Sequence, residues 1–279
     1  MEIQNYSNLI MGTKKFTKMH GLGNDFAVFD SREDTIQMEI SEIKAISNRF
    51  TGIGCDQLIV IEPPNTAHSD IFMRIYNSNG SEVGACGNAT RCVAAQIMDE
   101  NKTSQCAIET LEGILIAEKN QDGISVNMGQ VKTEWHEIPL ANRANTLKLD
   151  LSIEMLSNPV CLNVGNPHTV FFVTEVTKVP LERLGPLIEN HQMFPEKTNV
   201  EIVQVESNKN LTVRVWERGA GITMACGTGA CAAAAAAHLL ELADRNIDVK
   251  LDGGTLSINW LENGDIIMSG PTAISYRGY

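Results

Sequence analysis

The chain has 279 residues, of which 43% are apolar and 20% are charged. This composition is typical of a globular protein and excludes a disordered, collagen-like or coiled-coil chain, and the length fits one large or two modest domains. The net charge of −12 argues against a nucleic-acid partner bound through charge.

No segment of the sequence is typical of a secretion signal or a membrane span. The first 15 residues lack the apolar stretch of a secretion signal. The longest stretch without Asp, Glu, Lys or Arg, 219–240, is mostly Gly, Thr and Ala, which are too weakly apolar for a membrane span. We therefore expect a soluble cytoplasmic protein that has no membrane partner.

The seven cysteines predict free thiols. Their number is odd and no CxxC pair occurs, which argues against a disulfide framework, a zinc ribbon and a thioredoxin-type motif. The histidines other than His168 show no paired metal spacing, so no metal site is predicted. Most of the thiols are expected to be small buried apolar groups.

In the first half, an apolar strand over 72–76 leads into a Gly-rich loop that ends at Ala85-Cys86-Gly87. A helix of small residues over 88–100 follows. The next segments, 106–110 and 114–128, read as strands, with a hairpin turn at 121–123.

The second half repeats this order. A strand over 211–216 precedes Ala225-Cys226-Gly227, a helix over 228–243, and strands over 247–251 and 254–268 with a turn at 262–264. Cys86 and Cys226 are 140 positions apart, as are Arg74 and Arg214, while Gly113 and Gly254 are 141 apart. This near-constant offset predicts a duplicated fold, and the uncharged run 232–237 favours a buried central helix.

Cys86 and Cys226 each precede an expected helix N-terminus. Free N–H groups and the helix dipole favour negative charge there, so we expect lowered thiol pKa values at both positions. The flanking Gly87 and Gly227 allow a ligand to approach the backbone. If the halves face each other, one thiolate removes a proton from a carbon while the other thiol delivers one to the opposite face, which is two-base stereoinversion. Two alternatives stay open: both cysteines are structural, or they form a redox-active disulfide.

Six segments in order resemble diaminopimelate epimerase over nearly the whole chain, from Lys18 to about Tyr276. They are HGLGNDF (20–26), GIGCDQ (52–57), NSNGSEVGACGNATRC (77–92), GNPH (165–168), TNVE (198–201) and ERGAGITMACGTGAC (217–231).

The resemblance implies an isomerase of lysine and peptidoglycan precursor biosynthesis that interconverts LL- and meso-diaminopimelate without pyridoxal phosphate or metal. Cys86 and Cys226 then act as thiolate base and thiol acid, and Glu217 and His168 support catalysis. By the same resemblance the substrate-binding residues are Asn24, Gln57, Asn77, Gly87, Asn88, Asn166, Asn199, Arg218, Gly227 and Thr228.

The fold implied by the resemblance is α+β, with two pseudo-symmetric domains that each curl a mixed β-sheet around a central helix. The active site lies in the cleft between them. We expect the domains at 1–131 and 132–269, with the last strand, about 270–279, packing back on the first. The resemblance also implies a homodimer with Tyr276 at a dimer contact, and it leaves 1–13 as an N-terminal extension.

Two rival functions remain at this stage. A related racemase that needs no pyridoxal phosphate would keep both cysteines but change the residues for the distal end of the substrate. Asn77, Asn166, Asn199 and Arg218 are all present, which favours diaminopimelate. A thiol redox-switch protein would show no turnover at all.

Overall fold

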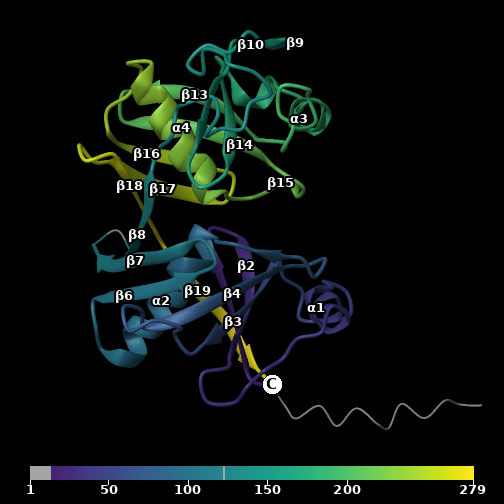
Figure 1. Ribbon diagram of the computed structural model, residues 1–279, viewed down its shortest axis with the longest axis vertical. Coiled ribbons are helices and arrows are strands. Elements are labelled where there is room, and N and C mark those ends of the chain that lie inside the picture. The colour runs from purple at the N-terminus through teal and green to yellow at the C-terminus, as the bar shows by residue number, and fades with distance from the viewer. Residues whose placement is uncertain (1–13, 122) are drawn as a thin grey trace, which may run out of the picture.

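The computed structural model describes residues 14–121 and 123–279, which form two lobes stacked end to end (Figure 1). The expected N-terminal extension, 1–13, and Asp122 of the first expected hairpin turn lie outside the described residues. The elements of the first lobe are β1 (Phe16–Gly21), β2 (Asn24–Asp30), α1 (Ile40–Ser47), β3 (Gln57–Glu62), β4 (Ile71–Asn77), β5 (Glu82–Val83), α2 (Gly87–Asn101), β6 (Gln105–Thr110), β7 (Gly113–Asn120) and β8 (Gly123–Gln130).

The second lobe repeats the same order of elements. Its elements are β9 (Ser152–Ile153), β10 (Leu156–Ser157), β11 (Val160–Asn163), β12 (Pro167–Phe172), a 3-10 turn η1 (Val176–Lys178), α3 (Leu181–Glu189), β13 (Asn199–Ser207), β14 (Asn210–Glu217), β15 (Gly221–Ile222), α4 (Gly227–Leu239), β16 (Asn246–Leu251), β17 (Gly254–Trp260) and β18 (Asp265–Gly270). In both lobes an antiparallel pair of strands (β1 with β2, β11 with β12) is followed by a parallel pair (β2 with β3, β12 with β13). The pairings of β4 with β6 and of β14 with β16 are parallel as well.

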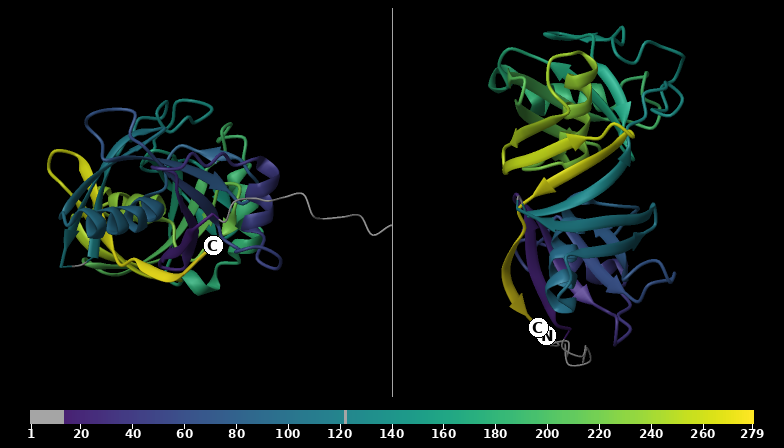
Figure 2. Two further views of the ribbon diagram at one scale, coloured as in Figure 1. Left: turned by 90° about the horizontal axis from the view of Figure 1, so that it is seen from below. Right: turned by 90° about the vertical axis from the view of Figure 1, so that its left-hand side faces the viewer.

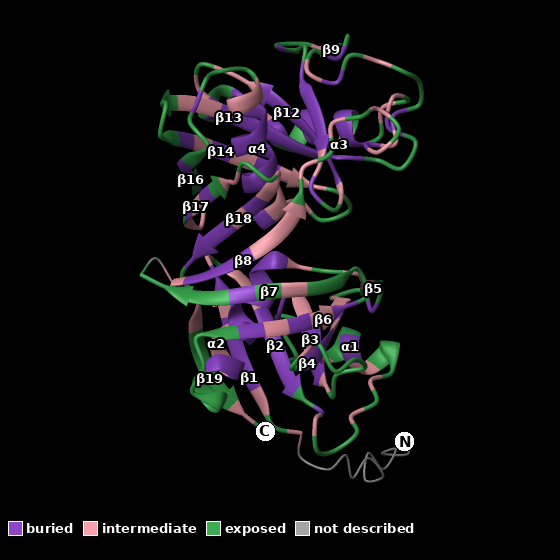
Figure 3. Cartoon of the chain, turned by 60° about the vertical axis from the view of Figure 1, so that its left-hand side comes forward, coloured by how far each residue is buried: buried purple, intermediate pink, exposed green. Residues whose placement is uncertain are grey.

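Each lobe wraps its strands around one central helix. Helix α2 packs against β1, β2, β6, β7 and β8, and α4 packs against β11–β14 and β16–β18. The six alanines 232–237 are each 3% exposed or less, because methyl side chains let strands approach α4 from several sides. Figure 3 shows α4 as mostly buried. The predicted α+β class with two pseudo-symmetric, helix-centred sheets is confirmed.

Two strand pairings join the lobes. Strand β8 pairs antiparallel with β18 as well as with β7, so one sheet continues through both lobes. The last strand, β19 (Ala273–Gly278), descends from the second lobe and pairs with β1, where Phe16 faces Gly278 (Figure 2). The domain boundary at 131/132 stays a prediction, because β8 takes part in both lobes.

The predicted end of the second helix was wrong. We expected a helix over 228–243, but α4 ends at Leu239. Glu241 has a left-handed φ of 59°, and the N–H of Leu242 donates to the carbonyl of Ala237, so the chain turns away into β16. None of the described helices is long and apolar enough to cross a membrane.

Candidate active site

Both repeated cysteines lie at helix N-caps, as the sequence predicts. Cys86 caps α2 and Cys226 caps α4, each with extended backbone angles. Cys226 is buried and its Sγ accepts a hydrogen bond from the N–H of Gly229 at 3.3 Å, whereas Cys86 is half-buried. Each thiol therefore sits beside N–H groups that the helix itself does not use.

The two helix starts meet where the lobes touch. A Cβ atom on Gly87 would lie 2.8 Å from Cε of Met268, and one on Gly227 would lie 2.8 Å from its Sδ. One methionine side chain thus contacts both helix starts, and a side chain at either glycine would displace it. The carboxamide of Asn88 also donates to the carbonyl of Ala225 at 3.0 Å across the lobes. The structure therefore brings the two cysteine-bearing loops to one place.

The expectation of lowered thiol pKa values was wrong. Burial raises the pKa of Cys86 to about 11, with a further contribution from Glu217, against the opposing backbone N–H groups of Ala89 and Asn88. Burial also raises the pKa of Cys226 well above its ordinary value, and Glu217 and Glu201 act in the same direction. Loss of hydration outweighs the helix dipole here, so both thiols are protonated at neutral pH.

Glu217 is the acidic side chain whose charge acts on both thiols. It ends β14, and one of its carboxylate oxygens accepts a hydrogen bond from the hydroxyl of Thr223. Burial raises the pKa of Glu217, and the Thr223 bond opposes that rise. A carboxyl group with a raised pKa beside two thiols is suited to proton transfer.

His168 is completely buried and both of its ring nitrogens are engaged. Nδ1 lies 2.7 Å from Oε1 of Glu201, and Nε2 lies 2.7 Å from Oδ1 of Asn166. An amide oxygen can only accept, so Nε2 carries a proton and holds the Asn166 side chain in one orientation. In this structure His168 therefore supports Asn166 within the second lobe.

The polar residues of the first lobe expected to bind substrate lie at the site-facing ends of β2, β3 and β4. Gln57 donates to Oδ1 of Asn77 at 3.2 Å across the β3–β4 ladder, and Asn77 in turn donates to Ser81. The buried Oε1 of Gln57 has no partner among the described residues. Asn24 bridges Asp56 and Asn88, with its Nδ2 2.9 Å from Asp56.

In the second lobe, the side chain of Asn199 connects two loops. Its Nδ2 donates to the carbonyl of Pro167 at 2.8 Å, and its Oδ1 accepts from the backbone N–H of Arg218 at 2.9 Å. The Arg218 side chain is exposed and donates to the carbonyl of Glu196. Thr228 lies 3.5 Å from the Sγ of Cys226 through its hydroxyl.

Sequence reasoning missed three residues around the site. Asp56 and Glu201 lie inside the GIGCDQ and TNVE segments but received no role, although both bond to predicted site residues. Arg91, inside GNATRC, is fully buried beside Met268. Their positions within the quoted segments were the available signal; their contacts depend on residues distant in sequence.

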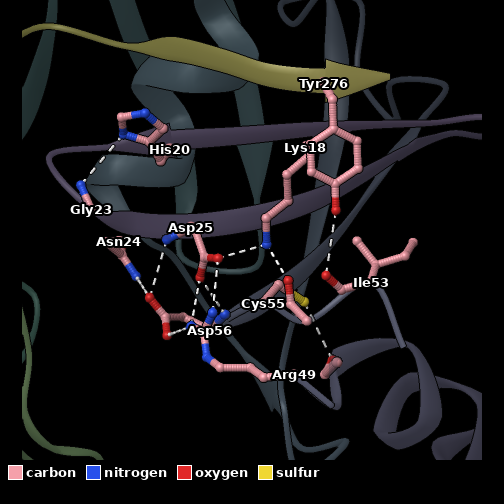
Figure 4. Close-up of polar contacts among 12 residues, drawn as sticks. Lys18, His20, Gly23, Asn24, Asp25, Arg49, Ile53, Cys55, Asp56 and Tyr276 are labelled. Carbon is pink, nitrogen blue, oxygen red and sulfur yellow. Dashed lines mark hydrogen bonds and ion pairs between the residues drawn. The ribbon is translucent and has the colours of Figure 1, made fainter. Parts of the chain in front are cut away.

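Tyr276 lies on β19, away from the thiols. It is 47% exposed, its ring packs edge-on against Phe16, and its hydroxyl donates to the carbonyl of Ile53 at 3.4 Å (Figure 4). A cavity of about 360 Å³ lies at the same end of the first lobe and includes none of the predicted site residues. Among the described residues, no cluster of three or more His, Cys, Asp or Glu side chains is arranged to hold a metal ion.

Comparison with known proteins adds family relationships to this geometry. The family model described as diaminopimelate epimerase matches residues 16–134 and 160–274. The chain is 45% identical over 266 residues to a diaminopimelate epimerase of Rhodospirillum centenum, covering 95% of this chain and 91% of that protein. It is 46% identical to one of Zymomonas mobilis, covering 95% and 97%.

Solved structures share the fold at low sequence identity. A hydroxyproline epimerase from Agrobacterium vitis, with bound trans-4-hydroxy-L-proline, has a TM-score of 0.68 at 11% identity, covering 95% of this chain and 92% of that one. A predicted epimerase from Pseudomonas aeruginosa has the same TM-score at 15% identity, covering 95% and 98%.

Proposed function

The chain belongs to the diaminopimelate epimerase family, and we propose that it interconverts LL- and meso-diaminopimelate with Cys86 and Cys226 as its two acid/base groups. One thiolate takes the α-proton, and the opposite thiol gives its own proton to the other face of the same carbon. The reverse reaction exchanges the roles, and neither pyridoxal phosphate nor a metal takes part. As an isomerase with this substrate, the enzyme serves lysine biosynthesis.

The observation that carries this proposal is the meeting of two duplicated helix N-caps at one contact between the lobes. Inversion requires one proton donor and one acceptor on opposite faces of a carbon, and each repeat contributes one thiol. Met268 and the Asn88–Ala225 hydrogen bond bring the two loops together.

The helix starts also supply a site for the reacting end of the substrate. The first backbone N–H groups of α2 and α4 point away from their helices; they belong to Gly87, Asn88, Gly227 and Thr228. The helix dipole favours a carboxylate at these two helix N-termini. As the α-proton leaves, charge develops on that same group. These fixed donors then stabilise the transition state more than the ground state.

Bound substrate would assist formation of the first thiolate, because burial raises the pKa values of both thiols. The α-ammonium of the substrate brings a positive charge beside the thiols, which lowers their pKa values. Glu217, whose charge acts on both thiols, would accept from that ammonium or take the thiol proton.

The distal amino-acid end of diaminopimelate needs donors and acceptors of its own. Asn24, Gln57, Asn77 and Asn166 offer both kinds of group, and the unpartnered Oε1 of Gln57 is one acceptor that bound substrate would satisfy. The guanidinium of Arg218 is exposed and suited to pair with a carboxylate. We also propose a cytoplasmic homodimer with Tyr276 at its contact.

The test is α-proton exchange in D₂O with purified, reduced protein. We expect deuterium at the inverted carbon when LL-diaminopimelate is offered, and a loss of at least about 100-fold in Cys86→Ala and in Cys226→Ala. Cys106→Ala, a buried cysteine on β6, is the matched control and keeps its activity.

Two results would change the conclusion. Full activity in either single cysteine variant contradicts the two-base assignment. Exchange with proline, hydroxyproline or another amino acid, but none with diaminopimelate, replaces the substrate with that of a related racemase. The structural likeness to a hydroxyproline epimerase makes those amino acids the first to include.

A further inference from the structure

A continuous chain of hydrogen bonds links Asp56 in the first lobe to the loop of Cys226 in the second. Nδ2 of Asn24 donates to Oδ2 of Asp56 at 2.9 Å. Oδ1 of Asn24 accepts from Nδ2 of Asn88 at 3.1 Å, and the same Nδ2 donates to the carbonyl of Ala225 at 3.0 Å. Figure 4 shows the Asp56 end of this chain.

The groups at the two ends of this chain of hydrogen bonds fix which atom donates and which accepts in each bond. A carboxylate and a backbone carbonyl can only accept, so Asn24 must turn its nitrogen toward Asp56 and its oxygen toward Asn88. Asn88 must then present both N–H groups, one to Asn24 and one to Ala225. Rotating either amide by 180° would set oxygen against oxygen.

The orientation of Asn88 has a cost that the chain must offset. Asn88 is 2% exposed, and its Oδ1 has no hydrogen-bond partner among the described residues. An unsatisfied buried acceptor costs about 1–3 kcal/mol. Two acceptor oxygens, those of the Asn24 side chain and the Ala225 carbonyl, therefore hold Asn88 in this orientation.

Asp56 itself is fixed by a cluster of charges. Nη2 of Arg49 lies 2.6 Å from Oδ1 of Asp56 and 2.8 Å from Oδ1 of Asp25. Asp25 and Asp56 also exchange backbone-to-carboxylate hydrogen bonds, and Lys18 forms an ion pair with Asp25 at 2.6 Å. Against the opposing effect of burial, these two cations hold the pKa of Asp25 down at about 2.

We propose that Asp56 is a positioning residue for the epimerisation, acting through Asn24 and Asn88 to set Cys226 opposite Cys86. Asn88 is two residues after Cys86 and Ala225 is one before Cys226, so the last bond of the chain connects the two thiol-bearing loops. The inference rests on the proposed function, although Asp56 contacts neither thiol.

The first test compares Asp56→Asn with Asp70→Asn. Asp70 is the matched control because its carboxylate also accepts a backbone N–H in the first lobe, from Ala107, away from the site. An asparagine at 56 can donate, so it allows Asn24 to turn its oxygen toward residue 56 and its nitrogen toward Asn88, which breaks the Asn24–Asn88 hydrogen bond. We expect kcat to fall about 10–100-fold, as for a thiol misplaced by about 1 Å, while KM changes less than about threefold.

The ratio of deuterium exchange to inversion separates misplacement of the thiols from a loss of stability, because a less stable protein would lower both rates equally. A misaligned second thiol lets the first return a solvent deuteron before inversion occurs. In Asp56→Asn we therefore expect deuterium in recovered LL-diaminopimelate to rise several-fold relative to inversion. An unchanged kcat, or an unchanged exchange-to-inversion ratio, would overturn the proposal.

A double-mutant cycle tests whether Asp56 acts through Asn88. In an Asn88→Ala background, Asp56→Asn should reduce kcat by less than about twofold further, because the connection is already broken. Multiplicative losses would show independent roles and refute the chain. If Asp56→Asn does not fold, Asn88→Asp tests the other end: it sets a carboxylate against two acceptors and must be less active than Asn88→Ala.

Cross-linking with dibromobimane tests the positioning role of Asp56 independently of the proposed reaction, because the assay needs no substrate. The reagent becomes fluorescent when it joins two thiols, and Cys226→Ala supplies the background. We expect slower cross-linking in Asp56→Asn than in Asp70→Asn. An inactive wild-type protein that still shows this difference contradicts the diaminopimelate assignment alone, whereas equal cross-linking rates contradict the positioning role.

Discussion

Arg91 is a buried cation with no carboxylate partner among the described residues, and replacing it with methionine is expected to stabilise the protein. Its side chain is 0% exposed, and Nη1 lies 3.2 Å from Sδ of Met268. Within the part of the chain that the structure describes, Nε and Nη2 have no hydrogen-bond partner, and no carboxylate lies within ion-pair distance of the guanidinium. Burial accordingly lowers the pKa of Arg91. Methionine has a similar length and removes both the charge and the unsatisfied donors.

The magnitude follows from the unsatisfied atoms. Each buried donor without a partner costs about 1–3 kcal/mol, so two of them place a lower limit of about 2 kcal/mol on the penalty that Arg91→Met relieves. Imperfect filling of the site takes back about 1 kcal/mol. We expect a net stabilisation of at least about 1 kcal/mol, and a rise in Tm of about 2–4 °C per kcal/mol.

The same substitution should impair catalysis. The charge of Arg91 opposes the effect of burial on the Cys86 thiol, so its removal raises the pKa of Cys86 further. The pH at which kcat/KM rises should then move upward, with lower activity at pH 7. Arg91→Lys keeps the charge and should keep the pH profile of the wild type.

Urea denaturation, thermal unfolding and the pH profile of kcat/KM together test this reasoning. Arg91→Met should be more stable and less active than the wild type. Destabilisation by more than about 1 kcal/mol would show that the guanidinium makes stabilising interactions beyond the Met268 contact. A stabilised variant whose pH profile matches the wild type would show that Arg91 does not influence the thiols.

Three further predictions follow from the packing and charges around the site. Gly229→Ala places a Cβ 3.0 Å from Glu201 and 3.3 Å from Sγ of Cys226, so kcat should fall about tenfold with little change in unfolding free energy; equal kcat would show that the thiol adapts. Alkylation of Cys86 by iodoacetamide, followed by mass spectrometry, should accelerate about tenfold per pH unit between about pH 7 and 9, since its pKa is raised to about 11; a plateau near neutral pH would indicate a resting thiolate. Because the folded pKa of Asp25 is lowered from 3.8 to about 2, its stabilising contribution is present above pH 3.8 and is lost as the pH falls toward 2; urea unfolding across this range should be less pH-dependent in Asp25→Asn.

The duplicated fold could be predicted because repetition is written in local sequence. Cys86 and Cys226 have nearly the same offset as the glycines of the following turns, and each cysteine precedes a run of small residues. Such runs form helices that strands can surround, so α2 and α4 were expected within one residue of their observed starts. The end of α4 was mispredicted because Leu240 and Leu242 continue an apolar pattern that left-handed backbone at Glu241 interrupts.

The segments that form the site could be predicted from the sequence, but the contacts and pKa values of their residues could not. The quoted segments contain Asp56, Glu201 and Arg91, but a single sequence does not show that Asp56 bonds to Asn24 or that Glu201 bonds to His168. Those contacts depend on the parallel pairing of strands that are distant in sequence. Burial, which raises the thiol pKa values against the helix dipole, is equally a property of the assembled lobes.

The sequence by itself determined the duplication, the helix starts and the residue types available for proton transfer, because these follow from local spacing and backbone preference. Only the tertiary structure decided which groups face each other across the lobes, which of them remain hydrated, and which amide orientation each hydrogen-bond chain permits. The pKa of each thiol depends on its burial and on charges from residues distant in sequence, and both are set only when the two lobes are folded and in contact.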